Sequence, residues 1–227
     1  MLQQRWIRHG AWAGIAFAVV VIASGAITGS PPGPDDTDQV FKDFFVDKRD
    51  QLLVQAWMYA LAAPLLLWFA AAVRRVLNEA EDGSYLGDLF LASVTATAAL
   101  LIAAMAMQVA VVTLADRLAP DVVRAIGLDF GAALVALFGF FVALTAMSFA
   151  AVVFASAVLP RWTAWLAVVA LVLNLVGTLG VFVDDGAFSI EGGFTVFVPA
   201  ASTVIWYLAT SIAMLRRPLS LTTRPVH

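Results

Sequence analysis

The chain has 227 residues, of which 62% are hydrophobic and 13% charged, and its net charge is −3. A water-soluble domain is ordinarily about 45–50% apolar and about one-quarter charged, so this composition excludes a soluble globular protein. Stretches that lack Asp, Glu, Lys and Arg occupy residues 9–34, 51–73, 89–115, 130–160, 162–183 and 192–215. Each can cross a bilayer, since about 20 apolar residues in a helix span its hydrocarbon core.

The sequence therefore predicts an all-α membrane protein, a bundle of six transmembrane helices. Residues 1–227 form a single transmembrane domain in this prediction. The expected spans are approximately residues 10–28, 51–73, 89–115, 127–158, 162–183 and 194–215.

The first apolar stretch follows Arg5 and Arg8 and contains the small residues Ala23, Ser24 and Gly25. Basic residues, an apolar run and small residues in this order also describe a secretory signal peptide. The run here is longer than the roughly 7–15 residues usual in such a signal. We therefore predict a retained first span.

The first outer loop is long and begins with Gly-Ser-Pro-Pro-Gly-Pro-Asp-Asp at residues 29–36. Consecutive Pro and Gly residues end the first helix, and Asp36 or Thr37 can cap a new one. The new helix would be short and amphipathic, with Val40, Phe41, Phe44 and Phe45 opposite Lys42, Asp43 and Asp47. Such a helix lies on the outer leaflet or covers the bundle. We favour the interpretation that it anchors the loop to the membrane over the interpretation that it acts as a gate.

Small residues repeat every three or four positions in the third and fourth spans. In the third they are Ala92, Ala96, Ala99, Ala103, Ala106, Ala110 and Thr113, and in the fourth Ala125, Ala132, Ala136, Gly139, Ala143, Ala146 and Ala150. Because small stripes let helix backbones approach closely, these spans are predicted to pack as an antiparallel hairpin along both stripes. Phe130, Phe138, Phe141 and Phe149 would then face lipid.

Asp129 continues the small stripe of the fourth span at its outer end. A carboxylate inside a membrane is costly and usually pairs with another group or faces a cavity. One interpretation is a proton or cation site partnered by Arg117 or Arg124. The other, which we favour, is a helix-end residue at headgroup depth that water solvates.

The remaining polar candidates within the spans are Thr97, Gln108, Thr145, Ser148 and Asn174. An amide in hydrocarbon needs a partner, so Gln108 and Asn174 are expected to bond to neighbouring helices as structural links. If Gln108, Asn174, Thr145 and Ser148 converged instead, they would line a small polar cavity for a neutral or weakly polar ligand.

The loops between spans divide into two sides of opposite charge. One side carries eight basic and four acidic residues, a net of +4, and the other carries five basic and twelve acidic residues, a net of −7. Basic loops stay on the cytoplasmic side, so both termini are predicted to be cytoplasmic. The acidic outer side argues against a nucleic acid partner.

The chain contains no cysteine and only two histidines, His9 and His227. Disulfides, thiol nucleophiles and most Cys- or His-bound metal sites are thereby excluded, and we expect no cofactor, no metal and no enzyme activity. Asp184, Asp185 and Glu191 are interpreted as solvated loop acids.

Three motifs resemble one known group of proteins. They are the Gly-Pro-rich segment at 29–36, Leu67-Trp68-Phe69 before Arg74-Arg75, and Leu159-Pro160-Arg161-Trp162. Together they resemble an uncharacterised family of six-helix membrane proteins common in actinobacteria. The resemblance implies a bacterial plasma membrane location and transfers no activity or catalytic residue.

The leading functional hypothesis is a non-enzymatic binding, sensing or accessory membrane protein. The alternative is a small secondary transporter of a lipophilic or weakly basic solute that uses Asp129. Expected partners are the lipid bilayer, a lipid or small lipophilic ligand, and another membrane protein or a second copy of the chain.

Overall fold

The computed structural model is all-helical and describes residues 2–29, 31–33, 35–80 and 85–217. Ser30 and Pro34 of the first outer loop lie outside the described residues, as do Glu81, Asp82 and Arg224 of the charge count. The C-terminal segment 218–227, whose predicted side is cytoplasmic, also lies outside them.

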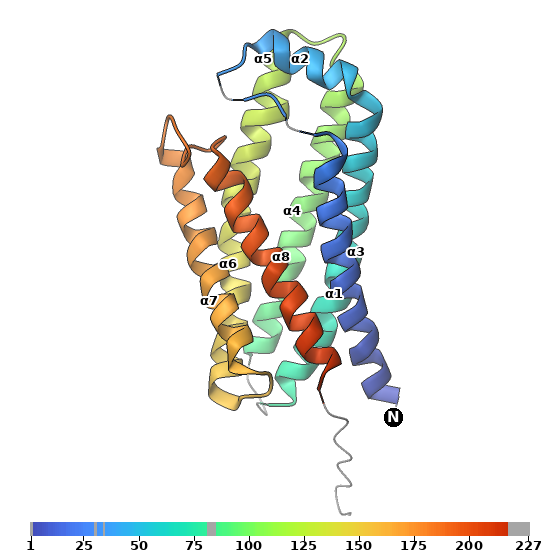
Figure 1. Cartoon of the computed structure of the whole chain (residues 1–227), viewed down its shortest axis with the longest axis vertical. Helices are drawn as coiled ribbons and strands as arrows, with labels where there is room; N and C mark the ends of the chain where they lie inside the picture. The colour runs from blue at the N-terminus through green and yellow to red at the C-terminus, as the bar shows by residue number, and fades with distance from the viewer. Residues whose placement is uncertain (1, 30, 34, 81–84, 218–227) are drawn as a thin grey trace, which may run out of the picture.

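Within the described residues, six helices are long and apolar enough to cross a membrane. They are α1 (Leu2–Ile27), α3 (Arg49–Asn78), α4 (Leu86–Leu114), α6 (Gly131–Ser156), α7 (Arg161–Thr178) and α8 (Gly193–Leu215). The short helices α2 (Asp38–Asp47) and α5 (Pro120–Arg124) lie at one end of the bundle, which we call the α2 end (Figure 1). A π-helical turn, η1 (Ala125–Phe130), joins α5 to α6, and a 3₁₀ turn, η2 (Leu179–Phe182), extends α7.

The spanning helices form a closed ring. Along it α1 contacts α3, α3 contacts α4, α4 contacts α6, α6 contacts α7, α7 contacts α8, and α8 returns to α1. Short connections make sequential neighbours antiparallel. In Figure 1, α8 crosses the bundle obliquely, from α7 near the α2 end toward α1 at the opposite end.

Glycines mark where α8 approaches its two neighbours. A Cβ atom added to Gly14 of α1 would collide with the Ser211 hydroxyl of α8 and the Phe69 ring of α3. A Cβ atom on Gly177 of α7 would lie 2.8 Å from Cγ of Pro199 in α8. Helix α8 is therefore held against α1 at one end of the bundle and against α7 at the other.

The burial of the two small-residue stripes differs from the prediction. In α4 the stripe is mostly exposed, and the opposite face, which includes Val94 and Ala98, is buried. In α6 the stripe is buried from Ala136 onward, but Gly139 faces the Asn174 carbonyl of α7. Helices α4 and α6 are neighbours, yet the predicted seam between two small stripes is wrong.

The predicted lipid face of α6 is also only partly exposed. Phe130 and Phe141 are exposed, whereas Phe138 lines an internal cavity and Phe149 is completely buried. Phe149 packs between Phe90 of α4 and Trp206 of α8. An apolar helix can present a large ring to lipid or to protein at similar cost, so this choice depends on the neighbouring helices.

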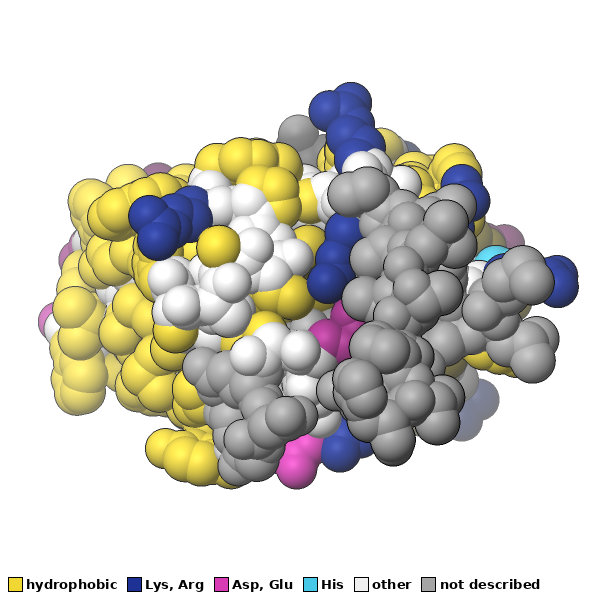
Figure 2. All heavy atoms as spheres, turned by 90° about the horizontal axis from the view of Figure 1, so that it is seen from below, with side chains coloured by type: hydrophobic (Ala, Val, Ile, Leu, Met, Phe, Trp, Pro, Cys, Tyr) yellow, Lys and Arg dark blue, Asp and Glu magenta, His cyan; other side chains and the backbone are white. Residues whose placement is uncertain are grey.

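The end of the bundle opposite α2 carries basic side chains among apolar ones (Figure 2). Two ion pairs lie there, Arg74 with Asp88 at 2.6 Å and Arg217 with Glu79 at 3.1 Å. Near the same end, Trp6, Trp12 and Trp162 are exposed on the helix surface. Exposed tryptophans close to helix ends are typical of a membrane–water interface.

Candidate functional site

The ring of spanning helices encloses an apolar cavity of about 340 Å³. All six spanning helices contribute to its wall, for example through Phe17 of α1, Leu66 of α3, Ala104 of α4, Val142 of α6 and Val204 of α8. Gly177 and Asn174 supply the α7 part. Ligand pockets in proteins occupy roughly 300–1,000 Å³, so this volume suits a small ligand.

Among the residues that the structure describes, no charged side chain lines the cavity. Its side chains with a hydrogen-bond donor are Tyr59, Thr97, Asn174, Thr195, Thr203 and Tyr207. An apolar wall with a few polar groups favours a neutral molecule, because a charge without a partner is costly to bury.

The cavity reaches the bundle surface beside α8. Phe197 and Ala200, both in its wall, are exposed. These residues lie in the half of α8 that packs on α7 through Pro199, away from the Gly14–Ser211 contact with α1. Figure 1 shows the oblique course of α8, whose half nearer the α2 end carries these exposed wall residues.

Tyr207 lies at the deep end of the cavity, farthest along α8 from the α2 end. Its ring packs against Trp206, Phe69 and Phe17, with ring centroids 4.7, 5.3 and 5.9 Å away. Its hydroxyl oxygen is buried and has no hydrogen-bond partner among the described residues. These contacts fix the ring and leave the hydroxyl unsatisfied.

Asn174 links α7 to α8 in the cavity wall. Its Nδ2 donates to the Ala170 carbonyl at 2.8 Å and to Thr203 Oγ1 at 3.0 Å. Thr203 in turn donates to the Pro199 carbonyl at 2.9 Å. The structural role that we expected for Asn174 is visible in these bonds, and the same residue lines the cavity.

The other polar candidates do not converge on one polar cavity. Gln108 bonds to the Leu52 carbonyl and the Gln55 side chain of α3, each at 3.1 Å. Thr145 and Ser148 donate to carbonyl oxygens within α6. Of the predicted polar residues, only Thr97 and Asn174 line the cavity. Thr97 donates to the Ser93 carbonyl of its own helix at 3.0 Å.

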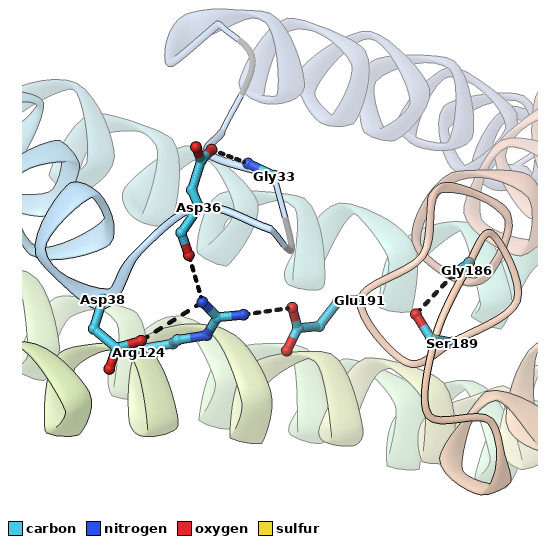
Figure 3. Close-up of polar contacts among 7 residues, drawn as sticks. All are labelled: Gly33, Asp36, Asp38, Arg124, Gly186, Ser189 and Glu191. Atoms are coloured by element: carbon cyan, nitrogen blue, oxygen red, sulfur yellow. Dashed lines mark hydrogen bonds and ion pairs between the residues drawn. The ribbon is translucent and has the colours of Figure 1, made fainter.

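A cluster of charged residues at the α2 end joins three segments around Arg124 (Figure 3). The Arg124 guanidinium donates to the Asp36 carbonyl at 2.8 Å and lies 3.6 Å from the Asp38 carboxylate. It also lies 3.4 Å from Glu191, which is in the loop before α8. The Cζ atom of Arg124 lies 4.7 Å from the centre of the Phe41 ring. Arg124 therefore connects the first outer loop, α5 and the start of α8.

Asp129 lies in this cluster, beside Glu191. Its Oδ1 atom is buried and accepts no hydrogen bond from a described residue. Burial raises the pKa of Glu191 above its ordinary value of 4.5, the neighbouring Asp129 raises it further, and Arg124 partly opposes both effects. The nearby Asp129 carboxyl therefore makes ionisation of Glu191 less favourable.

The two carboxyl residues are close in sequence to residues of the cavity wall. Asp129 precedes Val135 by six residues and Glu191 precedes Thr195 by four, and both Val135 and Thr195 are in the cavity wall. At about 1.5 Å per helical residue, the carboxyl pair lies roughly 10 Å or less along the helix axis from the wall.

Sequence reasoning missed two residues of this site. Glu191 was interpreted as a solvated loop acid, but its side chain is only 17% exposed and pairs with Arg124. Tyr207 was not identified, although a tyrosine well inside a span is a signal, because a buried hydroxyl needs a partner. The π-helical turn at Asp129 has no simple sequence signature; such turns often occur at functional sites.

Comparison with family models, with curated proteins and with solved structures finds no match to this chain. The geometry of the cavity and of the charged cluster therefore carries the functional argument.

Proposed function

We propose that this chain is a non-enzymatic membrane protein that binds a small lipophilic molecule in the cavity between its spanning helices. The observation that carries the proposal is the cavity itself, about 340 Å³ in volume and almost entirely apolar. Its exposed wall residues Phe197 and Ala200 would face the bilayer. A ligand dissolved in lipid would reach the site without crossing water.

A photolabelling experiment tests this proposal. The purified chain in lipid nanodiscs is irradiated with an uncharged alkyl diazirine that carries a terminal alkyne, and the labelled residues are mapped by mass spectrometry. We expect labelling of buried wall residues such as Val142 and Leu66, in addition to exposed residues that any lipid probe reaches.

A matched pair of variants on α4 provides the control. Ala104 is buried in the cavity wall, whereas Ala103 beside it is exposed. Ala104→Phe should fill the cavity and remove labelling of the buried wall, and Ala103→Phe should leave it unchanged. Equal labelling of the buried wall in both variants, or none in the unaltered chain, would refute the proposal.

We further propose that the chain resides in a bacterial plasma membrane with both termini in the cytoplasm. The split of charge between the two sides supports this orientation. In it, α2 lies at the outer surface, where Phe41 and Phe45 are buried against the protein and Val40 remains exposed.

The carboxyl pair favours a second candidate function, a proton-coupled transporter of a lipophilic solute. Burial and the neighbouring Asp129 raise the pKa of Glu191, and carboxyl groups of membrane proteins commonly serve in proton relays. Efflux of the neutral dye Nile red from proteoliposomes should respond to an imposed proton gradient. Asp129→Asn should abolish that response, and Asp121→Asn, an exposed acid nearby, should preserve it. A rate of dye efflux that is the same with and without the proton gradient would exclude this function.

A further inference from the structure

The cavity between the spanning helices is long and narrow. Its wall on α8 runs from Thr195 near the α2 end to Tyr207 at the deep end, and at about 1.5 Å per helical residue this wall is roughly 18 Å long. A volume of about 340 Å³ over that length gives a mean cross-section of roughly 19 Å². Apolar carbon atoms in contact lie about 4.0–4.5 Å apart, so one packed hydrocarbon chain occupies roughly 16–20 Å² in cross-section. The cavity therefore has the width of a single chain, and a compact polycyclic molecule is wider than this.

The wall of the cavity offers a ligand few polar groups. Within the described residues, most of its side-chain donors are already bonded to protein oxygens, namely those of Thr97, Asn174, Thr195 and Thr203. The Tyr207 hydroxyl is buried among the packed helices, out of reach of a ligand. The Tyr59 hydroxyl lies beside Gly25 of α1, an exposed residue outside the wall. A polar group placed in the cavity would lose its hydrogen bonds to water without replacing them, whereas hydrocarbon loses none.

The two ends of the cavity have different surroundings. At the deep end, the Tyr207 ring packs among aromatic rings of α1, α3 and α8. At the other end, the exposed wall residues Phe197 and Ala200 lie in the half of α8 nearer the α2 end. Glu191 of the charged cluster precedes Thr195 of the wall by only four residues. Apolar surroundings at one end and polar groups beyond the other match an amphiphile whose chain points toward Tyr207.

We propose that the cavity holds one unbranched hydrocarbon chain of a membrane lipid, with the chain end near Tyr207 and the polar head outside the cavity at the α2 end. The inference rests on the proposed binding function and names its ligand as a chain-bearing lipid in place of a compact lipophile. The chain would pass from the bilayer into the cavity beside Phe197 and Ala200, so the polar head need not enter the apolar interior.

The test uses two phosphatidylcholine probes in nanodiscs that differ only in the position of a photoreactive diazirine on one acyl chain. In one probe the diazirine is at the chain end, and in the other it is next to the carbonyl group. Val142 of the deep wall is buried, whereas its neighbour Phe141 is exposed. We expect the chain-end probe to label both residues, and the carbonyl-side probe to label Val135 nearer the α2 end and to lose the labelling of Val142.

Competition in the unaltered chain gives a second measurement that needs no variant. Decane and adamantane have the same number of carbon atoms, but decane is a chain and adamantane is a compact cage. A cage wider than the cavity must push the wall apart, and such overpacking is unfavourable. At equal mole fractions in the nanodisc, decane should reduce the labelling of Val142 by the chain-end probe. About tenfold more adamantane should be needed for the same reduction.

The outcomes separate this inference from the function on which it rests. If neither lipid probe nor the small alkyl diazirine labels Val142 or Leu66 of the buried wall, the binding function and the inference both fail. If the small diazirine labels them but the chain-end lipid probe labels only exposed residues such as Phe141, the cavity binds free lipophiles and the lipid chain is wrong. Equal labelling of Val142 by the two lipid probes would overturn the assigned direction of the chain, and equal competition by decane and adamantane would overturn its assigned shape.

Discussion

At the scale of single residues, the charged groups at the α2 end depend on burial for their properties. Arg124 and Glu191 are 67 positions apart in the sequence, and their side chains are only 20% and 17% exposed. A solvent-exposed ion pair contributes little to stability, but these two side chains are mostly buried. With Asp129 nearby, the cluster has more carboxyl groups than the Arg124 guanidinium can neutralise. The stability of the folded chain should therefore depend on whether Glu191 is protonated.

Glu191→Gln should therefore change how stability depends on pH. The pKa of Glu191 is raised in the folded chain above its ordinary value of 4.5, so the folded state binds the proton more tightly than the unfolded state. That contribution is fully present below the ordinary value and is lost as pH rises through the raised pKa. We expect the thermal midpoint of the unaltered chain in mild detergent to fall relative to Glu191→Gln between acidic and neutral buffer.

Asp185→Asn is the matched control for this prediction, because Asp185 is an exposed carboxylate in the same connecting segment. The difference in thermal midpoint between Asp185→Asn and the unaltered chain should vary little over the same pH range. A thermal midpoint of the unaltered chain that stays constant relative to Glu191→Gln, or that rises relative to it toward neutral pH, would contradict the assigned direction.

At the scale of helices, the position of α8 decides whether a cavity exists. Helix α8 contacts α1 through Ser211 beside Gly14, and it contacts α7 through Pro199 beside Gly177. Membrane helices gain no hydrophobic driving force from association, so close backbone approach at small residues provides much of the attraction. Because these two contacts lie on different neighbours at opposite ends, α8 is tilted and the cavity remains between them.

Gly14→Ala should destabilise the bundle. The added Cβ would collide with Ser211 and Phe69, and overpacking of this kind typically costs about 1–3 kcal/mol. The midpoint of thermal unfolding in detergent should fall accordingly.

Gly131→Ala offers the contrast, since among the described residues no atom outside the adjoining backbone lies within 4 Å of the added Cβ there. Replacing a helical Gly by Ala should stabilise that helix by about 0.5–1 kcal/mol. Equal effects of the two substitutions would show that the α1–α8 contact does not depend on Gly14.

At the scale of the whole molecule, the ring of helices has two chemically different ends. One end holds α2, α5 and the Arg124 cluster, and the other holds the Arg74–Asp88 and Arg217–Glu79 ion pairs. Membrane insertion follows the distribution of Lys and Arg in short loops. The proposed orientation therefore places the Arg124 cluster outside the cell.

Cysteine labelling can test this orientation, because the chain has no cysteine of its own. A membrane-impermeant maleimide should label Asp185→Cys in intact cells and should label Trp162→Cys only after lysis. Both positions are exposed and lie at opposite ends of the bundle. The reverse pattern would invert the proposed topology.

The sequence by itself determined the class of structure. Charged residues are so unfavourable in hydrocarbon that uncharged stretches identify membrane helices with little help from other signals. All six predicted spans correspond to long apolar helices. The need of Gln108 and Asn174 for partners on other helices also followed from the cost of an unbonded amide.

Only the tertiary structure decided which face of each helix points inward. These helices are apolar on all sides, so hydrophobic periodicity cannot distinguish a protein-facing side from a lipid-facing one. The exposed Ala stripe of α4, the buried ring of Phe149 and the unbonded hydroxyl of Tyr207 all result from that choice. The contact of Arg124 with Glu191, and the position of Asp129 beside Glu191, likewise required the start of α8 to fold beside α5. Contacts between distant segments depend on how helices pack, and in lipid that packing rests on shape more than on polarity.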